Sequence, residues 1–299
     1  MRLIFYGPKS EKAEKGIKLK KIGFIDYYLN EWHADNYPAW IEAVSDGNYK
    51  VCYCWGEIDC PHKGGMTNKE WAEKQGIELC SCEEEVIEKS DVLVVLAPDN
   101  PETHERLARR SLMSGKPTYV DKTFAPDFET AKRIFEIAEK HSTPCISTSA
   151  LRFADEYKEI DVGKVTGIAS IGSGKYEIYC IHQIEPMVML LGTDVEYVEA
   201  VSVGGIDTFI VSYKSGVVFT ATCINPGSPF QMSVNLNDNT SKMLTVESDV
   251  FANMMKALIE FFETGKELIP HAETLAVIHI RDAFKKAHEN PGKKIYLNS

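Results

Sequence analysis

One stretch of the sequence, residues 91–122, constrains the fold more than any other. Residues 92–97 form an unbroken apolar run, which is typical of a strand covered on both faces. Asn100 and Pro101 then suit the first positions of a helix, because asparagine can cap it and proline needs no N–H there. An amphipathic stretch follows, and residues 118–120 have the composition of the next strand. The pattern predicts one β-α-β unit with a right-handed crossover.

A lysine stands directly after the second strand of this unit. The two strands of such a unit are parallel, so Asp121 and Lys122 emerge together at the carboxyl end of the sheet. Open α/β sheets hold their ligands at that edge. We therefore predict that Lys122 is a functional residue rather than an ordinary surface lysine.

Three short segments in and around this unit follow a known pattern. They are residues 96–104, the Gly-Lys-Pro turn at 115–117, and Asp121-Lys122-Thr123. With them, the chain resembles the Gfo/Idh/MocA family of nicotinamide-dependent sugar and polyol oxidoreductases, whose Glu-Lys-Pro motif corresponds to the third segment. Lys122 matches the central lysine of that motif, whereas its two neighbours differ from it.

A second region extends the resemblance into the C-terminal half. Residues 176–185 are similar to the family's Asp-x-Gly-x-His-x-x-Asp segment, whose helix packs under the nicotinamide. His182 takes the histidine position, and Glu185 replaces the final aspartate. Ile178 and Cys180 stand at the first aspartate and the glycine, so one acidic group of the family's usual acid–base set is missing.

The pattern of strands and helices divides the chain into two domains. We predict a Rossmann-type doubly wound parallel sheet in residues 1–148, with 1–19 as an N-terminal extension that adds an edge strand. Residues 149–299 have the pattern of an α+β domain with a mostly antiparallel open sheet, because several alternating strands follow one another without helices. We expect a homo-oligomer to cover the apolar open face of this sheet. The side chains assigned to that face are Val201, Phe209, Val211 and Phe219.

The resemblance implies a site in a pocket between the domains. Lys122 and His182 would face one another there as the catalytic pair, with histidine as the base for a hydroxyl proton and lysine as the cation beside the developing alkoxide. The nicotinamide of NAD or NADP would accept the hydride. The residues assigned to cofactor binding are Ala97, Pro98, Asn100, Asp121 and Lys122. Those assigned to substrate binding are Arg152, Tyr176 and Glu185.

The loop after the first strand departs from the pattern of dinucleotide-binding folds. Such loops carry three glycines, which let the backbone approach the pyrophosphate. Here the corresponding positions hold Asp26, Tyr28 and Glu31, so we predict that the loop does not hold a pyrophosphate in the usual way. Pro38 would break a helix that began soon after the loop, and we expect the helix to start near Asn36.

Composition narrows the partners and the compartment. A net charge of −11 argues against nucleic acid or an anionic membrane surface as a partner. No stretch approaches ~18 uninterrupted apolar residues, and the apolar segment 3–6 is too short for a signal peptide, so we expect a cytoplasmic protein. The cysteines either form a metal cluster with His62 or are buried thiols. We favour thiols and predict no metal, because C-x-C is a poor zinc spacing.

Two functions remain open. The first is a dehydrogenase or reductase for a small hydroxylated substrate, such as a sugar or polyol, with Glu57 or Asp59 available to bind the ribose of NAD(H) or NADP(H). The second is a non-catalytic ligand-binding or regulatory protein that keeps the fold but lacks normal dinucleotide binding. Lys122 and His182 favour the first, and the first loop and Ile178 favour the second. We favour the oxidoreductase.

Overall fold

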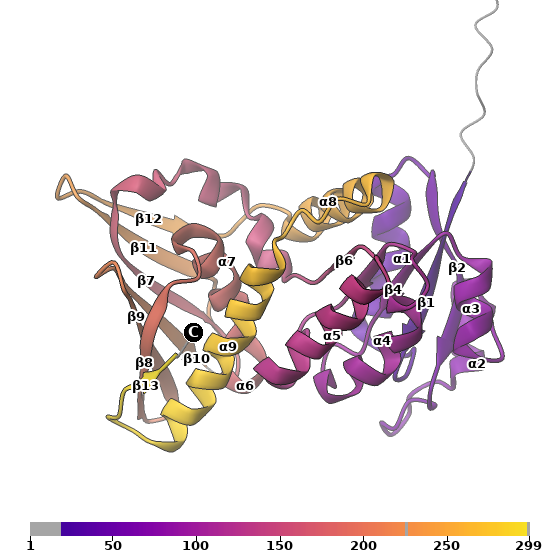
Figure 1. Cartoon of the computed structure of the whole chain (residues 1–299), viewed down its shortest axis with the longest axis horizontal. Coiled ribbons are helices and arrows are strands. Elements are labelled where there is room, and N and C mark those ends of the chain that lie inside the picture. Colours follow the sequence, from indigo (N-terminus) through magenta and orange to yellow (C-terminus); the bar gives the residue numbers. More distant parts are fainter. Residues whose placement is uncertain (1–18, 225–226, 298–299) are drawn as a thin grey trace, which may run out of the picture.

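The computed structural model describes residues 19–224 and 227–297, and these form two domains that lie side by side (Figure 1). Apart from its last residue, the extension predicted for residues 1–19 lies outside the described part of the chain, as does its edge strand.

The first domain is built on a parallel sheet with the strand order β3-β2-β1-β4-β5-β6. The strands are β1 (Lys20–Asp26), β2 (Tyr49–Gly56), β3 (Glu78–Leu79), β4 (Val92–Val95), β5 (Thr118–Val120) and β6 (Cys145–Ile146). The helices are α1 (Trp32–Val44), α2 (Asn68–Gln75), α3 (Glu83–Lys89), α4 (His104–Leu112) and α5 (Phe128–Lys140), with a short 3-10 turn at Pro101–Thr103. The predicted doubly wound fold is confirmed. Its order reverses between β1 and β4, which is where such sheets open a crevice for ligands.

The second domain carries a mixed sheet with the order β12-β11-β7-β10-β9-β8-β13. Its strands are β7 (Val165–Ser173), β8 (Val195–Val203), β9 (Ile206–Tyr213), β10 (Val218–Ile224), β11 (Gln231–Leu236), β12 (Ser241–Thr245) and β13 (Ile295–Tyr296). Its helices are α6 (Tyr176–Tyr179), α7 (Ile181–Leu191), α8 (Val250–Thr264) and α9 (His271–Glu289), and 3-10 turns span Ala150–Phe153, Asp155–Glu159 and Val162–Lys164. All strand pairs are antiparallel except β7 with β10, so the predicted mostly antiparallel sheet is confirmed.

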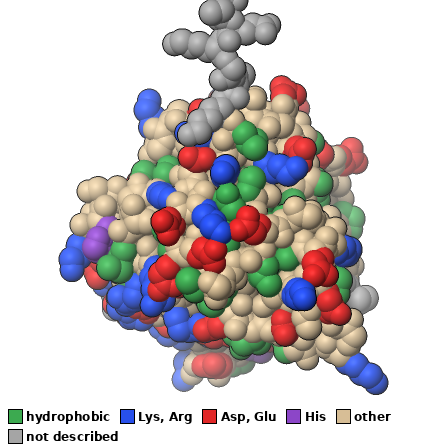
Figure 2. Space-filling view, turned by 90° about the vertical axis from the view of Figure 1, so that its right-hand side faces the viewer, with side chains coloured by type: hydrophobic (Ala, Val, Ile, Leu, Met, Phe, Trp, Pro, Cys, Tyr) green, Lys and Arg blue, Asp and Glu red, His purple; other side chains and the backbone are tan. Residues whose placement is uncertain are grey.

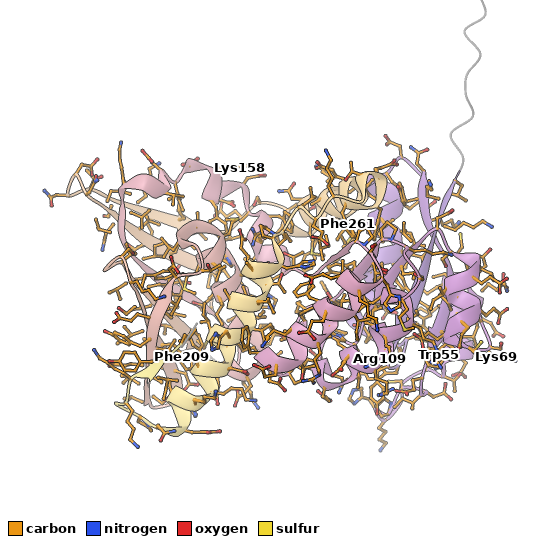
Figure 3. All side chains as sticks on the ribbon, viewed as in Figure 1. Trp55, Lys69, Arg109, Lys158, Phe209 and Phe261 are labelled. Carbon is orange, nitrogen blue, oxygen red and sulfur yellow. The ribbon has the colours of Figure 1, made fainter. Side chains whose placement is uncertain are left out.

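The prediction of an exposed apolar face on this sheet is wrong for three of its four residues. Phe209, Val211 and Phe219 are completely buried, and only Val201 is exposed. Phe209 stacks on Phe284 of α9 with ring centroids 4.0 Å apart, on the side of the sheet that the helices cover (Figure 3). Alternation along the strands therefore puts the large apolar residues under the helices. The homo-oligomer stays a prediction, but this apolar face no longer supports it.

Helix α8 comes from the C-terminal half but packs on the first domain (Figure 1). Met255, Leu258 and Phe261 of α8 are buried in the same apolar cluster as Tyr37 and Ile41 of α1. Phe261 is labelled in Figure 3. The domain limits predicted from the sequence, 1–148 and 149–299, do not anticipate this return. As a result, α1 has a neighbour that a dinucleotide-binding domain alone would not provide.

The predicted start of the first helix near Asn36 is wrong, because α1 begins at Trp32. The Glu31 side chain caps the helix by accepting hydrogen bonds from the backbone N–H groups of His33 and Ala34. Pro38 lies inside α1, where it donates no backbone hydrogen bond. The cap and the burial of the inner side of α1 offset that loss.

The surface of the first domain is mixed in charge. Figure 2 shows the end of the molecule that this domain forms, with acidic and basic side chains intermixed over it. Within residues 19–224 and 227–297, no helix combines the length and the apolar character that a membrane span requires. In the same ranges, no three His, Cys, Asp or Glu side chains come together as they would around a metal ion.

Candidate active site

A cavity of about 510 Å³ lies between the two domains. Lys122, from the end of β5, and His182, from α7, both line it, as the sequence analysis expects of this pair. His33 of α1 joins them. The rest of the wall is largely aromatic or apolar and includes Trp32, Tyr179, Phe230, Phe251 and Met254. A few polar groups in an apolar cavity of this size are typical of a small-molecule site.

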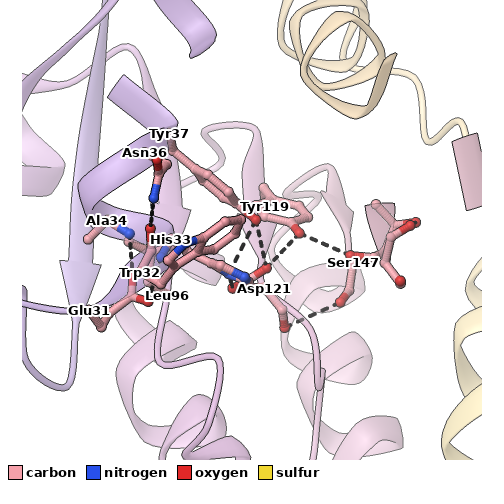
Figure 4. A network of polar contacts seen from close by, with 12 residues as sticks. Glu31, Trp32, His33, Ala34, Asn36, Tyr37, Leu96, Tyr119, Asp121 and Ser147 are labelled. Atoms are coloured by element: carbon pink, nitrogen blue, oxygen red, sulfur yellow. Dashed lines mark hydrogen bonds and ion pairs between the residues drawn. The ribbon is translucent and has the colours of Figure 1, made fainter. Parts of the chain in front are cut away.

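Asp121 is completely buried and does not line the cavity. Its carboxylate pairs with Nδ1 of His33 and accepts hydrogen bonds from the hydroxyls of Tyr119, at 2.8 Å, and Tyr37, at 3.3 Å (Figure 4). Burial alone would raise the pKa of Asp121, but the attraction of His33 and Lys122 and the Tyr119 hydrogen bond hold the pKa at about 2. Asp121 is therefore a buried carboxylate anion. Its oxygens are occupied by side chains of α1 and β5, and its predicted role in cofactor binding stays a prediction.

The sequence analysis missed His33. The residue lies in the first turn of α1 with its ring stacked on Tyr37, at a centroid distance of 5.0 Å. Because Nδ1 faces the Asp121 carboxylate, the neutral ring carries its proton on Nδ1 and leaves the lone pair on Nε2. Two signals were present in the sequence. An acidic residue ending a buried strand needs a partner, and Glu31 can cap a helix that starts before His33.

His182 is held differently from His33. Its Nδ1 lies 2.7 Å from Oγ of Ser149, in the turn that joins the domains. Burial, together with the charge of Lys122 and the nearby His33, lowers the pKa of His182 to about 3. The ring is therefore neutral at physiological pH and a weaker base than an ordinary histidine. The structure thus presents His182 to the cavity as a neutral hydrogen-bonding group.

Lys122 provides the positive charge of the cavity. Its ammonium group has no hydrogen-bonding or ion-pair partner within the described residues. The neighbouring Asp121 carboxylate already pairs with His33. The ammonium is therefore available to an anionic or partly negative oxygen of a bound molecule.

Arg152 and Glu185 do not line the cavity. Glu185 accepts a hydrogen bond from Thr148 at 2.9 Å and lies 3.6 Å from Arg152, which also pairs with Glu273 of α9. Burial raises the pKa of Glu185 to about 6, against the attraction of Arg152. These side chains connect the interdomain turn to α7 and α9. Their role in substrate binding stays a prediction.

The remaining predicted residues differ in whether they line the cavity. Pro98 lines the cavity, whereas Ala97 and Asn100 do not. Ala97 is buried and has a φ of 81°, a left-handed conformation that is strained for alanine and marks the end of β4. Tyr176 packs between Phe209 and His288, outside the cavity.

The first loop does not fit the pyrophosphate of a dinucleotide. The Glu31 carboxylate occupies the N–H groups at the start of α1, which in dinucleotide-binding folds face the phosphates. Asp26 is buried beside it, and its Oδ2 has no hydrogen-bond partner in the described structure. Burial and the nearby Glu31 raise the pKa of Asp26 well above its ordinary value. A phosphate here would meet two acidic groups instead of free backbone donors.

The two acids considered for ribose binding are also engaged. Glu57 forms an ion pair with Arg106, and Asp59 accepts a hydrogen bond from the backbone N–H of Asn68 at 2.7 Å. The Tyr28 hydroxyl lies 3.1 Å from Nε2 of His62, so it too has a partner within the protein. The residues around the first loop thus bind one another.

Solved structures show which proteins share this fold. The scyllo-inositol dehydrogenase of Lactobacillus casei with bound NAD(H) and scyllo-inositol has a TM-score of 0.75 at 13% identity, covering 93% of this chain and 99% of that chain. GenD2 from gentamicin A biosynthesis, in complex with NAD, has a TM-score of 0.76 at 11% identity and full coverage of both chains. The myo-inositol 2-dehydrogenase of Lactobacillus plantarum has a TM-score of 0.74 at 13% identity, covering 94% of this chain and 100% of that chain.

The chain therefore has the same fold as these inositol dehydrogenases and GenD2, in line with the fold that the Gfo/Idh/MocA resemblance implied. No protein-family model and no curated protein matches the sequence. At such low identity the likeness extends to the fold alone.

Proposed function

We propose that this chain is an enzyme that acts on a small hydroxylated substrate, such as a sugar or polyol, in the cavity between its domains. The observation that carries the proposal is the convergence of Lys122, His182 and the His33–Asp121 pair on one largely apolar cavity. Proton donors, proton acceptors and a cation are the groups that chemistry at a hydroxyl or carbonyl carbon requires. The volume of about 510 Å³ suits a compound of monosaccharide size.

The first candidate for this function is a nicotinamide-dependent oxidoreductase, and the shared fold supports it. Of the proteins of similar fold, the scyllo-inositol dehydrogenase was solved with NAD(H) and scyllo-inositol bound, and GenD2 with NAD. In this chain the first loop does not fit the pyrophosphate. A dinucleotide would therefore bind weakly, or rest on Pro98, Lys122 and their neighbours at the ends of β4 and β5. A second candidate, ligand binding without catalysis, is favoured by the Glu31 carboxylate at the start of α1.

The test begins with binding. Saturation-transfer NMR on the full chain with myo-inositol, sorbitol, D-glucose and D-fructose should show binding that Lys122→Met weakens by about tenfold, as the loss of one charge-assisted hydrogen bond predicts. Lys69→Met, on the exposed side of α2, is the matched control and should leave binding unchanged. Binding that is indifferent to Lys122, or no binding of any compound, would contradict the proposal.

Titration with NADH and NADPH, followed by cofactor fluorescence, then distinguishes an oxidoreductase from a protein that binds the substrate without a dinucleotide. Turnover of a bound polyol with NAD or NADP would establish the oxidoreductase. Substrate binding without cofactor binding would leave cofactor-free chemistry or simple ligand binding, and the next experiment distinguishes these two.

A further inference from the structure

We propose that His33 and Asp121 form an acid–base centre of their own, and that with it the cavity catalyses a redox-neutral proton transfer on a small α-hydroxy carbonyl compound, the class that includes open-chain sugars. This inference rests on the proposed function of the cavity as an active site. It differs from the oxidoreductase in requiring no dinucleotide.

The position of His33 carries the first part of the argument. The residue lies at the start of α1, beside the helix N-terminus that holds phosphates in dinucleotide-binding folds. In this chain the Glu31 carboxylate fills that N-terminus, and the imidazole of His33 lines the cavity next to it. The chain has thus placed an acid–base group near the point where other proteins of this fold class place their cofactor.

The surroundings of Asp121 carry the second part. Its carboxylate is fully buried and pairs through Oδ2 with Nδ1 of His33, while the hydroxyls of Tyr119 and Tyr37 donate to Oδ1 (Figure 4). A buried carboxylate on Nδ1 fixes the tautomer and orientation of a histidine and stabilises its protonated form. Nε2 of His33 has no hydrogen-bond partner in the described structure, so it is free to act on a molecule in the cavity.

The same cavity also holds two groups that can act on the oxygen atoms of the substrate. Lys122 brings a positive charge that can stabilise an oxygen anion, and His182 is a neutral imidazole oriented by Ser149. A neutral histidine can pass a proton between neighbouring oxygens without first becoming a fixed cation. In the cavity, His33 can therefore take a carbon-bound proton, Lys122 can stabilise negative charge on oxygen, and His182 can move protons between oxygen atoms.

These groups support a balanced reaction. Nε2 of His33 takes the proton from the hydroxyl-bearing carbon, and the electron pair of that C–H bond forms the C=C bond of an enediolate while the carbonyl electrons move to oxygen beside Lys122. His182 moves the hydroxyl proton to the former carbonyl oxygen, and protonated His33 returns its proton to the former carbonyl carbon. One carbon is oxidised and its neighbour reduced by the same electron pair. No external oxidant is needed.

The test is solvent-deuterium exchange without any nicotinamide. The full chain is incubated in D₂O with dihydroxyacetone, D-xylulose, D-fructose or D-glucose, and deuterium at the carbon beside the carbonyl is measured by NMR. We expect exchange above the protein-free rate, and a loss of about a hundredfold in His33→Gln, the usual contribution of one general base. His288→Gln is the matched control, because His288 pairs with Asp207 outside the cavity and should not affect exchange.

Imidazole rescue separates catalysis from a structural role. Added imidazole should restore exchange in His33→Ala, whereas it would restore nothing if His33 only anchored α1. Exchange that survives the loss of His33 would overturn the inference. Binding of these compounds without exchange would overturn it while leaving the proposed function intact, and failure of both binding and exchange across all compounds would count against both.

Discussion

Two turns at the same edge of the first sheet have opposite characters. After β1, the Glu31 carboxylate occupies the backbone donors of α1, and Asp26 is buried beside it. After β5, Asp121 is satisfied by its neighbours, and Lys122 is left free toward the cavity. The comparison teaches that one edge of a sheet can still line a cavity after a side chain of the protein, here Glu31, has occupied one of its anion-binding positions.

The largest effect on stability is expected from a substitution in the turn after β5. Asp121→Ala removes the partner of His33 and of two buried tyrosine hydroxyls, and each buried polar group left without a partner costs about 1 to 3 kcal/mol. Urea denaturation should show this loss in the free energy of unfolding. Asp99→Ala, an exposed residue of the cavity rim, should stay within about 0.5 kcal/mol of the unchanged protein. Equal effects of the two changes would show that the Asp121 pairing contributes little.

The first turn predicts a pH dependence of stability. Burial raises the pKa of Glu31 to about 7 from an unfolded value near 4.5, so the folded state binds more protons than the unfolded state between these values. Its contribution to stability is therefore complete below pH ~4.5 and is lost as pH rises to about 7, by an amount on the order of 3 kcal/mol.

Glu31→Gln tests this dependence, because the variant cannot ionise at this position. Unfolding curves at several pH values should show a flatter decline than in the unchanged protein. Glu185 contributes in the same direction up to about pH 6 in both proteins and cancels in the comparison, so the difference in decline should develop between pH ~4.5 and about 7. Parallel curves would contradict the assignment to Glu31.

The smallest effect tests whether the first turn is what weakens dinucleotide binding. Glycine at Asp26, Tyr28 and Glu31 together should strengthen NADH binding by about tenfold, because like-charge repulsion of about 1 kcal/mol is removed and helix donors are freed. Glu42→Gln, on the exposed side of α1, is the control for net charge. Low-micromolar binding of NADH by the unchanged protein would show that these side chains do not obstruct the pyrophosphate.

Periodicity identified most of the elements correctly. The apolar run at β4 and the strand at β5 lie where the sequence predicts them, and the second domain has the mostly antiparallel sheet that alternation predicts. Lys122 and His182 line one cavity, as predicted: Lys122 from its place at a strand end, and His182 from the family resemblance. Local patterns suffice for such features, since apolar spacing and strand ends follow directly from backbone geometry.

The errors came from contacts between distant segments. The start of α1 was misplaced because a single proline was weighed without the Glu31 cap or the packing of α8 on α1. The wrong face of the second sheet was taken as open because alternation shows two faces but not which one the helices cover.

By itself the sequence determined the doubly wound fold, the lysine at the end of β5 and the absence of a glycine-rich first loop. Only the tertiary structure decided that Glu31 occupies the start of α1, and that His33 pairs with Asp121, which is 88 positions away in the chain. The physical reason is that a buried carboxylate must find its partner in three dimensions, and that partner depends on how α1 packs against β5 rather than on any local pattern.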